Sequence, residues 1–214
     1  MEERLSGAGG DLAAHVHSGV ATVTLNRPQA LNALTFGMLE SLRDWLDRWE
    51  NEAGVRMVVL RGAGPKAFCA GGDIRIAESH AQMALPEPAV GLLPAGCGTQ
   101  MLPWLVGEGW AKRMILTNER VDAATALRIG LVQEVVDKGA SLATATALAE
   151  RVATLSPRSV EFCKSLIHNA RNGIAKTEGL ARERERFMDL FEYRDTAEGV
   201  NAFLEKRKPE WKND

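Results

Sequence analysis

Two short segments carry the residues that could take part in chemistry. The first is FCAGGD, in which Ala70, Gly71 and Gly72 follow an apolar stretch. Glycine permits a positive φ and lets a ligand approach the backbone without a Cβ in the way. Backbone N–H groups exposed there, above all if a helix starts at Asp73, would bind an anion or a developing oxyanion. An ordinary Gly-Gly turn explains the same residues, so both interpretations stay open for this motif alone.

Glu87 is the second candidate. It lies in LPEPAVGLLPAG, between Pro86 and Pro88 and with apolar residues on both sides. A carboxyl group that is partly removed from water has a raised pKa, which suits general acid–base catalysis. A solvated loop glutamate is equally consistent with these residues.

The histidines and the cysteines suggest no comparable site. All four histidines, at positions 15, 17, 80 and 168, are expected to have no catalytic role. Cys69 adjoins the glycine turn, but no base is visible beside it, and we interpret it as a small buried residue. Three scattered cysteines without zinc spacing favour a reduced, cytoplasmic protein with no structural metal.

Hydrophobic periodicity predicts the elements that hold these segments. HVHSGVATVTLN alternates apolar and polar residues, which predicts a strand that ends at residues 26–28. Residues 30–54 have apolar side chains near helical spacing, and Thr35 is the expected N-cap. The apolar run in VRMVVLRGAG is typical of a short strand that helices bury on both faces. This order of elements predicts a βαβ unit.

Downstream segments predict mainly helices. We expect helices at 104–116, 141–155 and 157–172, and a helix before Gly130 that is followed by a short strand. The charged tail at 176–206 also has a helical pattern. Its expected contact positions are Leu180, Phe187, Leu190, Val200 and Phe203. The chain is therefore expected to be α/β at first and helical in its last third.

Composition excludes several classes of protein. The formal net charge is −2, the pI is about 6.1, and basic residues are interleaved with acidic ones, so no basic surface for nucleic acid is expected. No apolar run approaches the ~20 residues that span a membrane. The N-terminus is acidic and glycine-rich, unlike a secretory signal. The length of 214 residues suits one α/β domain with a sizeable core.

Six segments, in order, resemble signatures of the enoyl-CoA hydratase/isomerase (crotonase) superfamily. NRPQALNAL resembles its NRP-x-x-x-NAL signature, and VVLRGAGPKAFCAGGDI resembles its first oxyanion-loop motif. AQMALPEPAVGLLPAGCGTQ resembles its P-E-x-x-x-G-x-x-P-x-x-G-G-T segment, with Cys97 where Gly or Ala is usual. DAATALRIGLVQEVV, LSPRSVEFCK and EGVNAFLEKRKPEW resemble its downstream signatures.

The resemblance implies an α/β fold with a crotonase-like ββα spiral core over residues 1–140 and a C-terminal helical trimerisation region over residues 141–214. It implies an acyl-CoA thioester substrate whose carbonyl is held by two backbone amides. It also implies that no metal or redox cofactor is needed, since coenzyme A is part of the substrate. The expected assembly is a homotrimer or a dimer of trimers.

The resemblance also assigns roles to residues. Gly72 matches the position that donates the first oxyanion amide. Glu87 matches the glutamate that exchanges a proton with the α-carbon and helps to hold the water. Ala95 matches a position whose amide contacts that water. Contacts with CoA are implied for Ala70, Gly72, Asp73, Ile74 and Arg75 and, in the tail, for Phe203 and Lys206.

The implied reaction is the reversible hydration of a 2-enoyl-CoA. A Δ3,Δ2-enoyl-CoA isomerase is the alternative, because Glu87 would serve either reaction. Hydrolases and dienoyl-CoA isomerases of this superfamily tend to carry an Asp eight residues after the glutamate. Ala95 stands there, which disfavours both.

One departure from the superfamily pattern is large. Several dozen residues normally separate the glycine turn from the segment that begins DIRIA, and they hold a strand, the second oxyanion amide and the second glutamate of hydratases. Here the two motifs adjoin. Two explanations stay open: the sequence omits a segment of the complete polypeptide, or the deletion is real and the protein is a non-catalytic CoA-binding or assembly protein. An intact mass near 23.3 kDa for the purified protein would rule out an omission.

Overall fold

The computed structural model describes residues 2–30, 32, 34–51, 54–63, 74–94 and 98–213. Contacts within the chain divide it into two units, Met1–Ala147 and Leu148–Asp214. The division falls inside α4 (Ser141–Ala153), a few residues after the predicted domain limit at residue 140. Each unit is described by itself.

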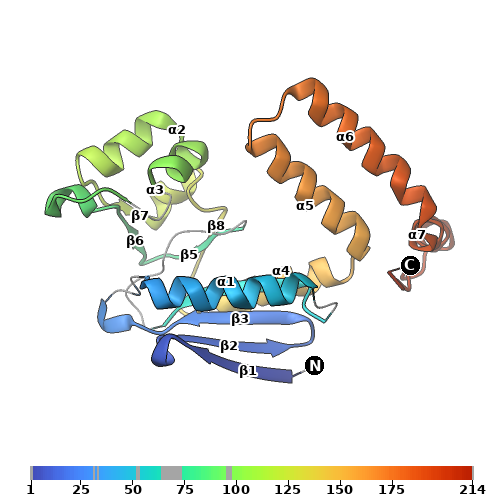
Figure 1. Cartoon of the computed structure of the whole chain (residues 1–214), viewed down its shortest axis with the longest axis horizontal. Helices are drawn as coiled ribbons and strands as arrows, with labels where there is room; N and C mark the ends of the chain where they lie inside the picture. Colours follow the sequence, from blue (N-terminus) through green and yellow to red (C-terminus); the bar gives the residue numbers. More distant parts are fainter. Residues whose placement is uncertain are drawn as a thin grey trace. The chain divides into compact units, whose positions relative to one another are not determined.

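A four-stranded sheet forms the beginning of the first unit (Figure 1). Its strands, in spatial order, are β1 (Glu2–Gly7), β2 (Leu12–His17), β3 (Val20–Leu25) and β4 (Met57–Gly62). β1, β2 and β3 are antiparallel neighbours. The single strand predicted across residues 15–26 is wrong: His17 pairs with Val20 across a two-residue turn in which Ser18 and Gly19 both have positive φ. Such a turn matches the twist of a β-hairpin.

Helix α1 (Phe36–Asn51) packs on this sheet and closes its core. The predicted cap is confirmed, because Thr35 Oγ1 accepts a hydrogen bond from the backbone N–H of Met38 at 3.2 Å. Alternate residues of β2 and β3 face the helix, as the period of a strand requires. The buried side chains of this core are Leu12, Ala14, Val16, Ala21, Val23, Leu25, Met38 and Trp49.

β4 pairs in parallel with β3, so the expected β-α-β order is confirmed. Val58 and Leu60 of β4 are half-buried and pack against this core. Val59 points to the opposite face of the sheet and is buried there, so β4 is covered on both faces, and the expectation that helices cover both of them stays a prediction. In the part of the chain that the structure describes, β4 is the last strand of its sheet.

The elements that follow β4 in the first unit pack around a second hydrophobic core. Its elements are β5 (Ile76–Glu78), β6 (Gln82–Met83), η3 (Glu87–Val90), α2 (Gly98–Leu116), β7 (Val121–Asp122), α3 (Ala123–Arg128) and β8 (Glu134–Val136). β5 pairs in parallel with β8, and β6 pairs antiparallel with β7. As predicted, the helix α3 stops before Gly130, whose φ is +78°. α2 bends at Gly107, whose φ of +79° is not helical.

The second unit is helical, as predicted. It holds the last residues of α4, then α5 (Pro157–Arg171), α6 (Lys176–Asp189), η4 (Leu190–Glu192) and α7 (Arg194–Glu205). α5 and α6 lie side by side (Figure 1). Of the expected contact positions only Leu190 is half-buried within this chain. The other four are exposed, namely Leu180, Phe187, Val200 and Phe203.

Residues 207–213, here named the C-terminal strap, fold back along α7. The carboxylate of Asp195 is 4% exposed and accepts hydrogen bonds from the backbone N–H groups of Lys212 and Asn213, each at 2.8 Å. Trp211 donates its indole N–H to the carbonyl of Thr154 at 2.8 Å. Arg207 makes two hydrogen bonds to the carboxylate of Glu198, at 2.6 and 2.9 Å. The strap is therefore held by the carboxylates of Asp195 and Glu198 on α7 and by the indole of Trp211.

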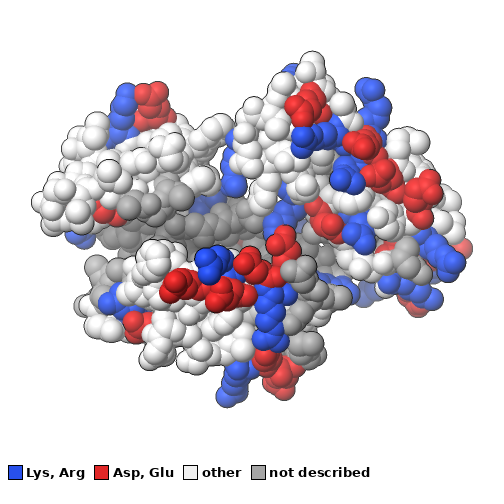
Figure 2. Space-filling model, in the orientation of Figure 1, with Lys and Arg blue, Asp and Glu red and all other residues white. Residues whose placement is uncertain are grey.

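The surface in Figure 2 mixes acidic and basic side chains, and on the visible face neither sign forms a continuous stripe. This agrees with the interleaving in the sequence. In the described part of the chain, no helix is long and apolar enough to cross a membrane.

Candidate active site

Glu87 occupies the first position of the short helix η3. Its backbone carbonyl accepts the N–H of Leu92 at 3.0 Å, and Gly91, with a φ of +77°, turns the chain back at the end of η3. Only glycine takes that conformation without strain. Since Pro86 precedes Glu87 and Pro88 follows it, the backbone on both sides of the glutamate has a restricted φ. The local sequence thus fixes the direction in which this carboxyl group leaves the chain.

The carboxyl group of Glu87 is half-buried, and its Oε2 atom is inaccessible to water. Within the described residues, that oxygen has no hydrogen-bond partner. A buried polar atom without a partner is costly, and in folded proteins it usually marks a place where another group binds. This oxygen is therefore the candidate atom of the site for proton transfer.

Apolar side chains lie exposed on the segment that follows Glu87. We call them the apolar shelf: Val90, Leu92 and Leu93, together with Trp104 of the adjacent helix α2. Each has more than 60% of its surface exposed. Exposed apolar side chains on a segment that also carries a buried polar atom are a common feature of small-molecule sites.

The second core of the first unit anchors this segment. Met83 and Leu85, just before Glu87, pack against a cluster that α2, α3 and the strands around them contribute. Leu102 and Met114 of α2 are buried in the same cluster. Glu87 therefore stands at the edge of a packed core, which limits its movement.

Arg75 is tied to the end of α3. Its Nε donates to the carbonyl of Leu131 at 2.6 Å, and its guanidinium reaches the carbonyl of Gly130 at 3.4 Å. Its backbone N–H donates to the side chain of Gln133 at 2.9 Å. These bonds tie Arg75 to the turn that follows α3. The neighbouring Ile74 is exposed, and the predicted CoA contacts of both residues stay predictions.

Several predicted site residues lie outside the described residues. They are Ala70, Gly72, Asp73 and Ala95, together with Cys69 and Cys97. The predicted oxyanion donor at Gly72 thus stays a prediction. The sequence analysis assigned no role to Asn32, which is completely buried and donates a hydrogen bond to the carbonyl of Ala63, just after β4. Asn32 is the second asparagine of the NRPQALNAL segment, so the resemblance marked its position, but it did not assign a role to the side chain.

Phe203 and Lys206 lie in the second unit, at the end of α7. Phe203 is 82% exposed. Lys206 has a φ of +53° at the position after the helix, where glycine is the usual residue. A left-handed lysine costs about 1–2 kcal/mol relative to glycine. The chain therefore keeps a charged side chain there in spite of backbone strain.

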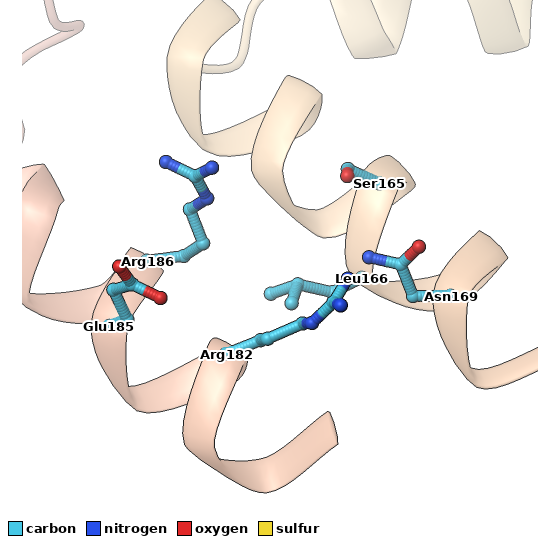
Figure 3. A pocket seen from close by; sticks show the side chains of 6 residues that line it. All are labelled: Ser165, Leu166, Asn169, Arg182, Glu185 and Arg186. Carbon is cyan, nitrogen blue, oxygen red and sulfur yellow. The ribbon is translucent and has the colours of Figure 1, made fainter. Parts of the chain in front are cut away.

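A cavity of about 430 Å³ opens between α5 and α6 (Figure 3). Its charged lining is Arg182, Glu185 and Arg186. Arg182 pairs with Glu178 at 2.5 Å, and Arg186 pairs with Asp189 at 2.9 Å. Since carboxylates neutralise both guanidinium groups, this cavity is a poor site for an anion.

Two family models between them match residues 20–214 of this chain. A family model described as "Enoyl-CoA hydratase/isomerase" matches residues 72–214, and another with the same description matches residues 20–82. The short-chain-enoyl-CoA hydratase of Clostridium acetobutylicum is 33% identical, over 89% of this chain and 93% of that protein. Its alignment runs over 244 positions, more than the 214 residues of this chain, so that relative contains residues without a counterpart here.

Two solved structures with the same fold match nearly the whole of this chain. The structure of Pseudomonas aeruginosa DspI is 43% identical, with a TM-score of 0.87 over 94% of this chain and 97% of that one. An enoyl-CoA hydratase from Bacillus anthracis is 29% identical, with a TM-score of 0.88 over 95% of this chain and all of that one.

Proposed function

The chain belongs to the enoyl-CoA hydratase/isomerase family, and on this premise we propose that it catalyses the reversible addition of water across the double bond of a 2-enoyl-CoA. The fold is the crotonase-like α/β fold of that family. The observation that carries the proposal is the buried Oε2 of Glu87, which lacks a partner among the described residues and lies beside the apolar shelf.

Glu87 handles the proton in this reaction. The oxygen of water adds to the β-carbon and gives up one proton, and the electrons of the double bond move onto the thioester oxygen to form an enolate. These electrons return as a proton is delivered to the α-carbon, so that one OH and one H are added in total. A carboxyl group near the α-carbon performs that transfer in either direction, which accounts for reversibility. The apolar shelf suits the acyl part of such a substrate, because it offers exposed apolar surface to a hydrocarbon chain.

Stabilisation of the enolate is assigned to the backbone amide of Gly72. One oriented N–H at the developing negative charge is worth about 2.7–4 kcal/mol. Proposed contacts with CoA are those of Ala70, Asp73, Ile74 and Arg75, and Ala95 is the proposed amide donor to the water. This chemistry uses a glutamate and backbone amides, so we propose that it requires no metal or redox cofactor.

The end of α7 supports a further part of the proposal. Phe203 is exposed and Lys206 is held in a strained conformation, as expected for side chains that are kept to contact CoA. Exposed apolar residues of the second unit also favour a homotrimer or a dimer of trimers; they include Leu180, Phe187, Met188, Phe191, Val200 and Leu204. A molar mass from light scattering at several concentrations tests the assembly.

Hydration of crotonyl-CoA, followed by its loss of ultraviolet absorbance, tests the function. We expect Glu87→Gln to lower kcat by about 10²–10⁴-fold, because the amide cannot exchange the proton, while butanoyl-CoA still binds. Glu134→Gln is the matched control, since this glutamate is exposed on β8, and it should change kcat by less than about twofold.

Other outcomes of this assay are equally informative. A wild-type protein that binds acyl-CoA but leaves crotonyl-CoA unchanged would contradict a hydratase. If the protein does not hydrate crotonyl-CoA but raises the ultraviolet absorbance of a 3-enoyl-CoA, it is the isomerase. An unaltered rate in Glu87→Gln would remove this residue from the mechanism.

A further inference from the structure

Gly98, the first residue of α2, lies against both ends of residues 85–94, which carry Glu87 and are named here the Glu87 loop. A Cβ atom added to Gly98 would lie 2.6 Å from Cβ of Pro94 and 3.5 Å from Cδ1 of Leu85. Carbon atoms in contact are favourable at about 3.5–4.0 Å, so the first of these distances is a clash. A side chain at this position therefore requires a part of the protein to move.

The parts of the protein that meet at Gly98 differ in how readily they can move. Leu102, one turn further along α2, is buried in the second hydrophobic core of the first unit, which holds this end of the helix. Leu85 packs against the same core, and Pro94 is buried. Packed interiors are hard to compress and transmit strain. A Cβ atom at position 98 is therefore expected to displace the Glu87 loop rather than the helix.

Hydrogen bonds inside the Glu87 loop pass such a displacement to Glu87. The backbone N–H of Leu92 donates to the carbonyl of Glu87 at 3.0 Å, and the N–H of Ala89 donates to the carbonyl of Pro86 at 3.0 Å. The short helix η3, which begins at Glu87, also packs against α2. Only Pro86, with its fixed φ, separates Leu85 from Glu87. When the ends of the loop move, the carboxyl group of Glu87 moves with them.

We propose that Gly98 is a positioning residue for Glu87, because its lack of a side chain lets the first turn of α2 close against both ends of the Glu87 loop. This inference rests on the proposed function, in which Glu87 exchanges a proton with the α-carbon. A misplacement of ~1 Å at a reacting group costs ~10²-fold in rate. Gly98 acts on the reaction through Leu85 and Pro94.

A set of substitutions isolates the contact between Gly98 and Pro94. Gly98→Ala adds the Cβ atom that the loop excludes. Gly98→Ala/Pro94→Gly removes the opposing Cβ atom, whereas Gly98→Ala/Pro94→Ala keeps it, and each double variant is compared with its own Pro94 single variant. Gly109→Ala is the matched control, because it adds the same atom to the same helix at a point where no other part of the described chain lies within 4 Å.

Two readouts are needed. The first is the position of the carboxyl carbon of Glu87 in crystal structures of the wild type and of Gly98→Ala, which requires no turnover. The second is kcat and KM for crotonyl-CoA hydration, with the melting temperature measured alongside. A merely structural role for Gly98 would lower the melting temperature and would leave both the carboxyl group and the kcat of the folded protein unchanged.

We expect the carboxyl carbon of Glu87 to move by more than about 0.5 Å in Gly98→Ala, which exceeds the tolerance of a catalytic group. The kcat should fall by about 10–100-fold, with KM within about threefold of wild type, because proton transfer is impaired and substrate binding is not. Gly98→Ala/Pro94→Gly should reach the kcat of Pro94→Gly to within about threefold, whereas Gly98→Ala/Pro94→Ala should stay about 10–100-fold below Pro94→Ala. Gly109→Ala should keep the wild-type kcat.

A carboxyl group of Glu87 that stays in place in Gly98→Ala would overturn the proposal, and so would a wild-type kcat in that variant. Equal losses in the two double variants, or a matching loss in Gly109→Ala, would overturn it too. If Gly98→Ala does not fold, Gly98→Ala/Pro94→Gly carries the test, because it must fold and reach the kcat of Pro94→Gly. A wild-type protein that leaves crotonyl-CoA unchanged, while Gly98→Ala displaces the carboxyl group as expected, would refute the proposed function alone.

Discussion

Replacing Asp195 with asparagine is expected to release the C-terminal strap. The buried carboxylate accepts two backbone N–H groups, from Lys212 and Asn213, both at 2.8 Å. Asparagine keeps one acceptor oxygen, but it has an NH₂ group in place of the other. This NH₂ group would face one of the two backbone N–H groups, and a donor cannot accept from a donor. One charge-assisted hydrogen bond is lost, and a buried donor is left without an acceptor.

The expected cost follows from those two changes. A hydrogen bond to a charged group contributes about 1.5–3 kcal/mol, and an unsatisfied buried group costs a comparable amount. Because residues 208–213 of the strap form neither helix nor strand and can relax, we expect a net loss of about 2 kcal/mol. For a chain of this size, that loss lowers the melting temperature by about 4–8 °C.

Thermal unfolding by circular dichroism, at one fixed protein concentration, measures this shift. Hydrogen exchange detected by mass spectrometry should show faster exchange in residues 207–213 of Asp195→Asn. Asp137→Asn is the control, because Asp137 is exposed in a loop and should not change the melting temperature. An Asp195→Asn variant that melts within about 1 °C of wild type and keeps its strap protected would refute the reasoning.

Two further predictions concern the first unit. Gly7→Ala should destabilise the protein by about 1–3 kcal/mol in urea, because the added Cβ would lie 2.8 Å from Cβ and Oγ of Ser41 on α1; an unchanged urea midpoint would contradict this packing. Burial raises the pKa of Glu78, but hydrogen bonds from the Ser141 hydroxyl and from the backbone N–H groups of Gly139 and Ser141 outweigh burial and lower that pKa below 4.5. The stability that Glu78 contributes is thus complete above pH 4.5 and is lost as the pH falls through its lowered pKa. Glu78→Gln should therefore lower the free energy of unfolding by more at pH 7 than at acidic pH.

Local patterns predicted several of the helices. α1 and its cap at Thr35 follow from apolar spacing and one hydroxyl, and the end of α3 follows from Gly130. Glu87 stood out because two prolines and apolar neighbours frame it. The hairpin between β2 and β3 was missed, because its Ser18-Gly19 turn lacks the Asn-Gly or Asp-Gly pair that marks such turns.

Long-range contacts explain what the sequence did not reveal. The bond from Asn32 to Ala63 and the bond from Arg75 to Leu131 join residues far apart in the chain. No periodicity reports which carbonyl a buried amide or guanidinium will meet, since that depends on how separate elements pack.

The pairing of the strands also bears on the order in which the chain folds. All four strands of the first sheet and the helix that covers it come from residues 2–62, with hairpin neighbours and one short crossover. β5, by contrast, meets β8 only after more than fifty further residues have been made, because Ile76 pairs with Glu134. Local pairings form faster than distant ones, since less loop entropy is lost in closing them. The N-terminal sheet can therefore assemble while the ribosome is still adding the segment that carries Glu87.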